Sequence, residues 1–180
     1  MTFKEAVEQT PQVAEAYKSG LSAFGDYSVK VIVPDNRLLG GSVDIDAATV
    51  ELYPNDNRWD YAFDYNGESF FIEVHTASTS ETSKVLRKLE WLKLWLRVQA
   101  PKLENLKSKV LPSFYWVQSK QYALPTHTPQ YRKAVSAKLI PIKEWNYALL
   151  LKRYAPLPKS KKKLPKYLRD SDNENPFGRP

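Results

Sequence analysis

Asp60, Glu73 and His75 have the side-chain types and the spacing to act together in one site. Carboxylate oxygens are the ligands that Mg²⁺ and Mn²⁺ prefer, and an imidazole beside them can act as a general base or as a further metal ligand. The three residues flank Asn66-Gly67, the dipeptide that best supplies the two positive φ angles of a type I′ hairpin turn. The sequence therefore predicts a β-hairpin that brings these groups together.

The predicted hairpin determines which residues face each other. With a two-residue loop, counting outward from the turn places Asp60 opposite Glu73 at a non-hydrogen-bonded position, where Cα atoms lie about 4.5 Å apart. Two carboxylates at that spacing repel, so a shared proton, a neighbouring cation or a bound metal has to offset the repulsion. Alternation along the strand places His75 beside Glu73, with Arg58 opposite His75.

The two faces of the hairpin differ in chemical character. One face is predicted to pack into the core, because its residues are apolar or aromatic: Trp59, Tyr61, Phe63, Tyr65, Phe70, Ile72 and Val74. The other face carries the polar group. A purely structural interpretation of that group is a solvated outer face on which Arg58 pairs diagonally with Glu73.

Composition limits the kinds of site that the chain can build. It has no cysteine and only two histidines, which excludes disulfides and thiolate metal sites and argues against a His-rich zinc site. The oxygens of two carboxylates suit Mg²⁺ or Mn²⁺ as the cofactor. One histidine with two carboxylates also suits Mn²⁺ or Fe²⁺, so an iron-dependent oxygenase is a more distant alternative.

Length and hydropathy indicate a folded protein without membrane association. At 180 residues, 42% of them hydrophobic and 13% aromatic, the chain suits one domain with a sizeable core. No window approaches the ~18 uninterrupted apolar residues of a transmembrane helix. The N-terminal sequence MTFKEAVEQ has no apolar run and no cleavage signature, which favours a cytoplasmic protein.

The net charge of +7 is concentrated at the C-terminal end. From Leu157 onward there are seven basic and three acidic residues, and the composition turns to Pro, Lys, Asp and Asn. We therefore expect one α/β domain over residues 1–155 and a basic, disordered tail over 156–180. The tail either solubilises the end of the chain or binds nucleic-acid phosphates through Lys159, Lys161, Lys162 and Lys163.

The remaining sequence predicts the elements that position the hairpin. A capping box at Thr2–Glu5 opens a short helix, and Thr10-Pro11 opens a second helical segment. Gly40-Gly41 marks a break in the chain, and Asp46 could cap a short helix through Leu52. Strands are predicted over 29–33, 42–46, 114–117 and 139–142, and a helix over 144–154.

The longest predicted helix runs over 78–100 and is opened by a second capping box, at Ser78–Glu81. Its core stripe consists of Val85, Leu89, Leu92 and Leu96. On the opposite side, Trp91 and Trp95 interleave with Lys84, Arg87 and Lys88. This side is either a stacking and phosphate-binding surface for nucleic acid or a second packed layer covered by lysine stems.

The order of helix, three strands, long helix and strand, together with Asp60, twelve intervening residues and Glu73-Val74-His75, resembles the core of the PD-(D/E)XK nuclease superfamily. The resemblance covers about residues 2–117. It implies an α+β protein with a restriction-endonuclease-like αβββαβ core, in which helices flank a mixed central sheet. It also implies a Mg²⁺ or Mn²⁺ cofactor and the hydrolysis of nucleic-acid phosphodiesters.

The resemblance assigns Asp60 and Glu73 as the two metal-binding acids, with Asp44 as a rival for the first. A helical acid would come from Glu5, Glu8 or Glu15. His75 stands where the family has lysine, and histidine is near neutral at pH 7. Lys84 or Lys88, on the helix that follows the hairpin, is the candidate to replace that lysine.

Two functions remain open from the sequence. The first is a metal-dependent nuclease, in which Arg58, Arg87 and the tail lysines bind nucleic acid. The second is a nuclease-fold module without activity that binds nucleic acid or a protein partner, which includes a second copy of the chain. The Asp60–Glu73 pair favours the first function, and the missing lysine favours the second.

Overall fold

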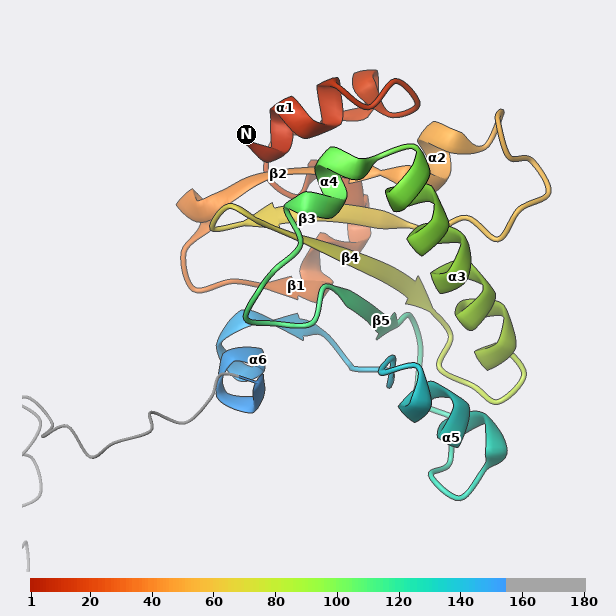
Figure 1. Cartoon of the computed structure of the whole chain (residues 1–180). Coiled ribbons are helices and arrows are strands. Elements are labelled where there is room, and N and C mark those ends of the chain that lie inside the picture. Colours follow the sequence, from red (N-terminus) through yellow and green to blue (C-terminus); the bar gives the residue numbers. More distant parts are fainter. Residues whose placement is uncertain (155–180) are drawn as a thin grey trace, which may run out of the picture.

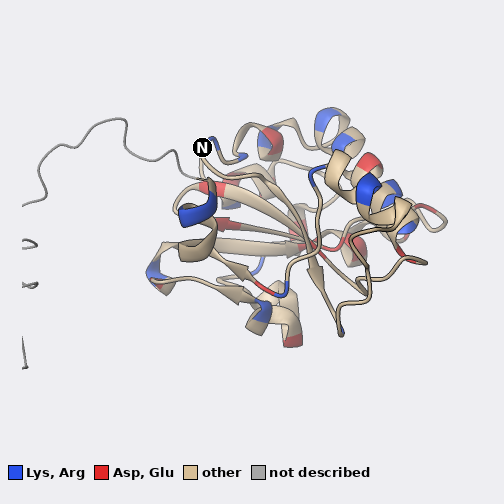
Figure 2. Cartoon of the chain, turned by 90° about the horizontal axis from the view of Figure 1, so that it is seen from below, with Lys and Arg blue, Asp and Glu red and all other residues tan. Residues whose placement is uncertain are grey.

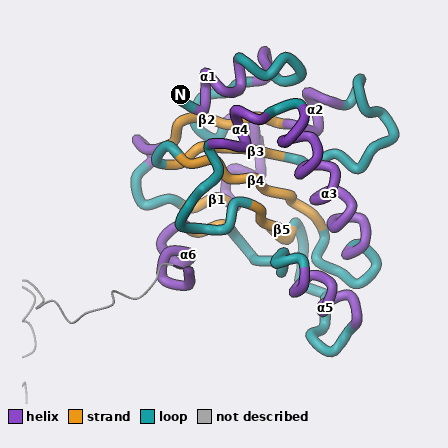
Figure 3. Tube along the Cα trace, in the orientation of Figure 1, coloured by secondary structure: helices purple, strands orange, loops and turns teal. Residues whose placement is uncertain are grey.

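A mixed four-stranded sheet, in the order β2-β3-β4-β5, forms the centre of the computed structural model, which describes residues 1–154 (Figures 1 and 3). β2 pairs antiparallel with β3, β3 antiparallel with β4, and β4 parallel with β5. A second sheet of two short parallel strands lies nearby. The strands are β1 (Val31–Ile32), β2 (Leu39–Asp44), β3 (Tyr61–Tyr65), β4 (Glu68–His75), β5 (Phe114–Gln118) and β6 (Trp145–Asn146).

The predicted hairpin is confirmed in its register. Tyr65 pairs with Glu68 and Phe63 with Phe70 across the two-residue loop, so β3 and β4 have the predicted partners. Asn66 and Gly67 have φ angles of 56° and 79°, as a type I′ turn requires. The candidate site residues of the hairpin are therefore placed by a turn that the sequence specifies locally.

Helices cover one face of the sheet, where α1, α3 and α4 pack against it (Figure 1). The predicted stripe of α3 is buried against Ala62 and Phe71 of the hairpin. The face that carries Asp60 and Glu73 is therefore an interior face. The interpretation of a solvated outer face is wrong, because α3 covers it. The helices are α1 (Phe3–Glu8), α2 (Ile45–Thr49), α3 (Thr82–Val98), α4 (Pro101–Asn105), α5 (Pro129–Ser136) and α6 (Tyr147–Tyr154).

The other face of the sheet packs on an aromatic cluster. Phe63, Phe70 and Ile72 contact Phe24 and Trp145 there, with β1 and α6 on the outside. This confirms the predicted core face of the hairpin except at one position. Trp59 packs instead among the helices, because β3 begins only at Tyr61 and strand alternation does not extend back to Trp59.

Several predicted elements in the N-terminal part differ from the structure. The Thr2–Glu5 capping box is confirmed, but the segment after Thr10-Pro11 forms turns and a 3-10 helix rather than a regular helix. Gly40-Gly41 lies inside β2 at a β-bulge, and Asp44 rather than Asp46 caps the following helix α2. The 3-10 helices are η1 (Ala14–Ala16), η2 (Ser22–Lys30) and η3 (Asn36–Leu38), and η2 occupies the start of the strand predicted over 29–33.

The C-terminal part also differs from the prediction. α3 begins at Thr82 without a side-chain cap, so the second capping box is wrong, and α5 was not predicted although Thr128 caps it and Pro129 begins it. The strand predicted over 139–142 is reduced to one bridge between Ile142 and Val117. No helix among residues 1–154 is long and apolar enough to cross a membrane. The predicted tail, with Lys159 to Lys163, lies outside the described residues.

Candidate functional site

The backbone of the hairpin holds Asp60 and Glu73 against each other. Asp60 comes directly before β3, and its N–H donates a hydrogen bond to Oε2 of Glu73 at 3.2 Å. In return, the N–H of Val74 donates to Oδ2 of Asp60 at 2.9 Å. The Glu73 side chain is fully buried, and 19% of the Asp60 side chain is exposed. The predicted cross-strand neighbourhood of the two carboxylates is confirmed.

Lys88 supplies the cation that offsets the repulsion between the two acids. Its Nζ lies 2.8 Å from Oδ1 of Asp60 and also forms a hydrogen-bonded ion pair with Oε1 of Glu73. Because Leu89 and Leu92 pack α3 onto the sheet, the neighbouring Lys88 is held over the end of the hairpin with 11% of its side chain exposed. Of the two lysines considered from the sequence, Lys88 reaches the acids and Lys84 is exposed.

The charges of this cluster shift one another's ionisation. Burial and the neighbouring Glu73 raise the pKa of Asp60 to about 7, although Lys88 and the Val74 N–H act in the opposite direction. Burial opposes the charge on Lys88, but the carboxylates of Glu73 and Asp60 outweigh it and raise the pKa of Lys88. A carboxyl group whose pKa is raised in this way marks a candidate functional site, and buried structural ion pairs shift pKa values as well.

His75 joins the cluster from the same face of β4. Its Nδ1 lies 3.3 Å from Oε1 of Glu73, and its Nε2 lies 2.7 Å from Oε2 of Glu81. The hydrogen bond to Glu73 and the one to Glu81 raise the pKa of His75, although burial opposes this. The imidazolium form donates from both nitrogens and has no lone pair for a metal, so this arrangement favours a charged positioning group over a metal ligand.

Glu81 is the member of the cluster that sequence reasoning missed. The S-x-x-E spacing assigned it to a helix cap, but its side chain turns back to His75 across the loop between β4 and α3. The positive charge on His75 lowers the pKa of Glu81 through this hydrogen bond. The available signal in the sequence is that a second acid, Glu81, follows His75 closely. Whether their side chains meet depends on the path of the loop between β4 and α3.

The carboxylate oxygens of Asp60 and Glu73 suit a divalent cation chemically, but the Lys88 ammonium already contacts both of them. Asp60 and Glu73 offer the oxygen ligands that Mg²⁺ and Mn²⁺ prefer. All four of their carboxylate oxygens have partners, namely Lys88, His75 and backbone N–H groups. Among residues 1–154, no group of three or more His, Cys, Asp or Glu is arranged to hold a metal ion. A cation bound here would therefore share or take the place of the Lys88 ammonium.

The other acids considered for the site serve local roles. Asp44 pairs with Tyr61 across β2 and β3 and accepts from the Ala47 N–H, as the cap of α2. Glu5 completes the capping box of α1. The two remaining candidate acids, in α1 and η1, lie on exposed surface, and the first pairs with a lysine of its own helix: Glu8 and Glu15.

Of the residues predicted to bind nucleic acid, some pack within the fold and others are exposed on its surface. Arg58 pairs with Asp46 at 2.9 Å, so its predicted pairing with Glu73 is wrong. Arg87 is exposed on α3. Trp95 is buried, whereas Trp91 is half-buried and lies parallel to it with ring centroids 5.9 Å apart. Figure 2 shows basic and acidic positions interspersed over the described residues.

Comparison of the chain with protein-family models, with curated proteins and with solved structures gives no match. The features of the chain that bear on function are therefore the cluster of Asp60, Glu73, His75, Glu81 and Lys88 and the sheet that positions it.

Proposed function

We propose that this protein is a metal-dependent nuclease-like phosphodiester hydrolase, in which Lys88 of α3 takes the part of the lysine that β4 lacks. The observation that carries this proposal is the position of the Lys88 ammonium between Asp60 and Glu73 at one end of the hairpin. The resemblance to the PD-(D/E)XK superfamily requires two acids and a lysine at one place, and the chain provides them from the residue before β3, from β4 and from α3.

The strand arrangement supports the same proposal. A sheet in which β2, β3 and β4 are antiparallel neighbours and β5 joins β4 in parallel, with α1 and α3 on one face, agrees with the αβββαβ core expected from the resemblance. Asp60 precedes β3 and Glu73 lies in β4, as the two acids of that superfamily lie on adjacent strands.

Each residue of the cluster has a chemical task in this proposal. Asp60 and Glu73 supply oxygens for Mg²⁺ or Mn²⁺, an ion that when bound supplies an activated water and a positive charge for the leaving oxygen. Lys88 places a cation where negative charge develops on the phosphate. His75, held by Glu81, fixes the orientation of the Glu73 carboxylate. Exposed Lys84 and Arg87 beside the partly open ring of Trp91 provide a surface for the nucleic acid.

The burial of Glu73 favours a second candidate function. Its carboxylate is fully buried and saturated with partners, which is the arrangement of a structural ion pair rather than of an open catalytic site. In that case the protein is a nuclease-fold module without activity that binds nucleic acid or a protein partner. The two functions differ in whether a divalent cation enters between the acids.

Cleavage assays with purified variants test the proposal. The wild-type protein should cleave single-stranded or duplex DNA or RNA with Mn²⁺ or Mg²⁺ and not with EDTA. Glu73→Gln and Lys88→Met should abolish cleavage, while Glu90→Gln, at an exposed position of α3, serves as the matched control. If the wild-type protein is inert with both metals on all of these substrates, the binding-module function replaces this proposal.

A further inference from the structure

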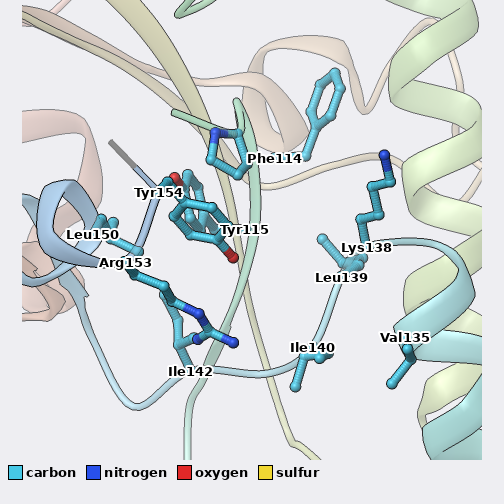
Figure 4. A pocket seen from close by; sticks show the side chains of 11 residues that line it. Phe114, Tyr115, Val135, Lys138, Leu139, Ile140, Ile142, Leu150, Arg153 and Tyr154 are labelled. Carbon is cyan, nitrogen blue, oxygen red and sulfur yellow. The ribbon is translucent and has the colours of Figure 1, made fainter. Parts of the chain in front are cut away.

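A cavity of about 250 Å³ lies beside β5, away from the acid cluster (Figure 4). It opens between the end of α5 and the last turns of α6, and none of Asp60, Glu73, His75 or Lys88 lines it. Its volume is somewhat below the roughly 300–1,000 Å³ of pockets that bind drug-sized ligands. The size therefore suits a small organic molecule.

The cavity exists because the edge of the sheet is only half covered. Ile142 pairs with the second half of β5: its N–H donates to the Trp116 carbonyl, and its carbonyl accepts from the Gln118 N–H, both at 2.9 Å. The chain reaches Ile142 from α5 through Lys138, which has a φ of 55°. Phe114, at the start of β5, is left beside the opening rather than under a paired strand.

The wall of the cavity is mainly apolar. Side chains from the chain between α5 and β6, from β5 and from α6 form it: Phe114, Leu139, Ile140, Ile142 and Leu150. Apolar walls with a few polar groups are typical of pockets that bind small molecules. An aromatic or branched hydrocarbon body would bury its surface here.

Two cations mark the cavity for an anion. Lys138 and Arg153 stand on opposite sides of it (Figure 4), and among residues 1–154 no Asp or Glu lines it. Within residues 1–154, neither of the two forms an ion pair with a carboxylate. Most exposed cations need no paired carboxylate because water surrounds them. Two cations at the rim of one apolar cavity, however, give that cavity a positive potential.

Tyr115 adds a buried hydroxyl whose proton has no acceptor among residues 1–154. The residue is 6% exposed and lines the cavity, and the polar group next to its hydroxyl is the Trp145 indole N–H, which can only donate. Leaving a buried hydroxyl unpaired is unfavourable, so such groups usually meet a partner in protein, water or ligand. An acceptor oxygen on a bound molecule would satisfy it.

We propose that this cavity binds a small organic carboxylate with an aromatic or branched apolar body. The anionic end lies toward Arg153, and the Tyr115 hydroxyl donates to an oxygen of the ligand. Lys138, on the opposite side of the cavity, adds to its positive potential. The apolar body lies against Phe114 and Ile142. This site does not depend on the function proposed for the acid cluster.

Calorimetric titration of the full-length protein with 4-phenylbutyrate, and with its neutral amide as the matched ligand, tests the charge requirement. The acid should saturate the protein and bind about tenfold more tightly than the amide at low salt, because a charge-assisted hydrogen bond is worth more than a neutral one. Arg153→Gln should weaken the binding of the acid about fivefold, and Lys138→Gln should weaken it by a smaller factor. Lys152→Gln and Lys133→Gln, at exposed neighbouring positions, should not.

Three further variants test the location and the role of the buried hydroxyl. Val135→Phe adds volume at the rim from an exposed position and should abolish binding, while Ser136→Phe, on the next residue outside the cavity, should not. Tyr115→Phe should leave the stability of the free protein unchanged or higher and should weaken the acid. Equal affinity for acid and amide, binding unaffected by Val135→Phe, or no saturable binding of the acid would each overturn the proposal.

Discussion

The Nζ atom of Lys88 lies 2.8 Å from Oδ1 of Asp60, although the two residues are 28 positions apart in the sequence. This contact joins α3 to the hairpin and decides the electrostatics of the whole cluster. Without Lys88, the carboxylates of Asp60 and Glu73 would face each other with only backbone N–H groups and His75 to stabilise their charges. The stability of the protein should therefore depend on Lys88 more than on any exposed lysine.

Lys88→Met should destabilise the protein by about 3 kcal/mol at pH 8, because it leaves buried charge uncompensated. At pH 5.5 the cost should be clearly smaller, since protonation of the acids relieves their repulsion. Urea denaturation at the two pH values measures the free energy of unfolding. Lys84→Met, at an exposed position of the same helix, is the matched control. An equal cost at both pH values would show that Lys88 contributes through packing alone.

Asp60→Asn should change the pH dependence of stability. Burial raises the pKa of Asp60 from 3.8 to about 7, so between these values the folded state binds more protons than the unfolded state, and stability falls as the pH rises. Asparagine cannot ionise. We expect the variant to gain on the order of 2 kcal/mol relative to wild type between pH 5 and pH 8. A difference in unfolding free energy that stays constant across this range would contradict the raised pKa.

His75 should stabilise the protein at acidic rather than alkaline pH. Its pKa is raised by Glu73 and Glu81, so its contribution is fully present below about pH 6.5 and is lost as the pH rises through its higher folded-state value. His75→Gln should cost about 1 kcal/mol at pH 6 and little at pH 9. His127→Gln, in an exposed loop, should cost nothing at either pH. Thermal melts across this range provide the measurement.

The hairpin could be predicted because its information is local. Asn66-Gly67 fixes the turn, the turn fixes the register, and the register places Asp60 beside Glu73 with His75 on the same face. No distant residue is needed for these steps. The same applies to the buried stripe of α3, where helical periodicity alone identifies the core side.

The partners of the hairpin could not be predicted because they depend on how elements pack. Whether Lys84 or Lys88 reaches the acids depends on the rotation of α3 and on where the helix begins. Because α3 begins only at Thr82, the Glu81 side chain does not cap the helix and instead bonds His75. The S-x-x-E capping pattern does not indicate which of these two roles Glu81 takes. The cavity beside β5 could not be predicted either, because it results from packing that leaves half of the edge of β5 uncovered.

His75→Lys restores the motif of the resembled superfamily, but in the proposed nuclease it should not raise activity. There Lys88 already provides the cation, and a second ammonium at position 75 would crowd Glu73 and remove the bond to Glu81. We expect cleavage with Mn²⁺ to fall below that of wild type. A clear rise in the rate would mean that Lys88 is only a structural partner and that position 75 is where the catalytic cation belongs.

Metal titration separates the two roles of Lys88. If a divalent cation binds between Asp60 and Glu73, it has to share or displace the ammonium, so Lys88→Met should bind Mn²⁺ more tightly than wild type while losing cleavage. At ten times the Kd, a bound ion stabilises the folded state by about 1.4 kcal/mol, which a thermal melt resolves. Mn²⁺ should therefore recover part of the stability that Lys88→Met loses at pH 8. Asp60→Asn should abolish the Mn²⁺-dependent rise in Tm in both backgrounds. If Mn²⁺ leaves the Tm of Lys88→Met unchanged, the two carboxylates do not form a metal site, and the cluster is a structural ion pair.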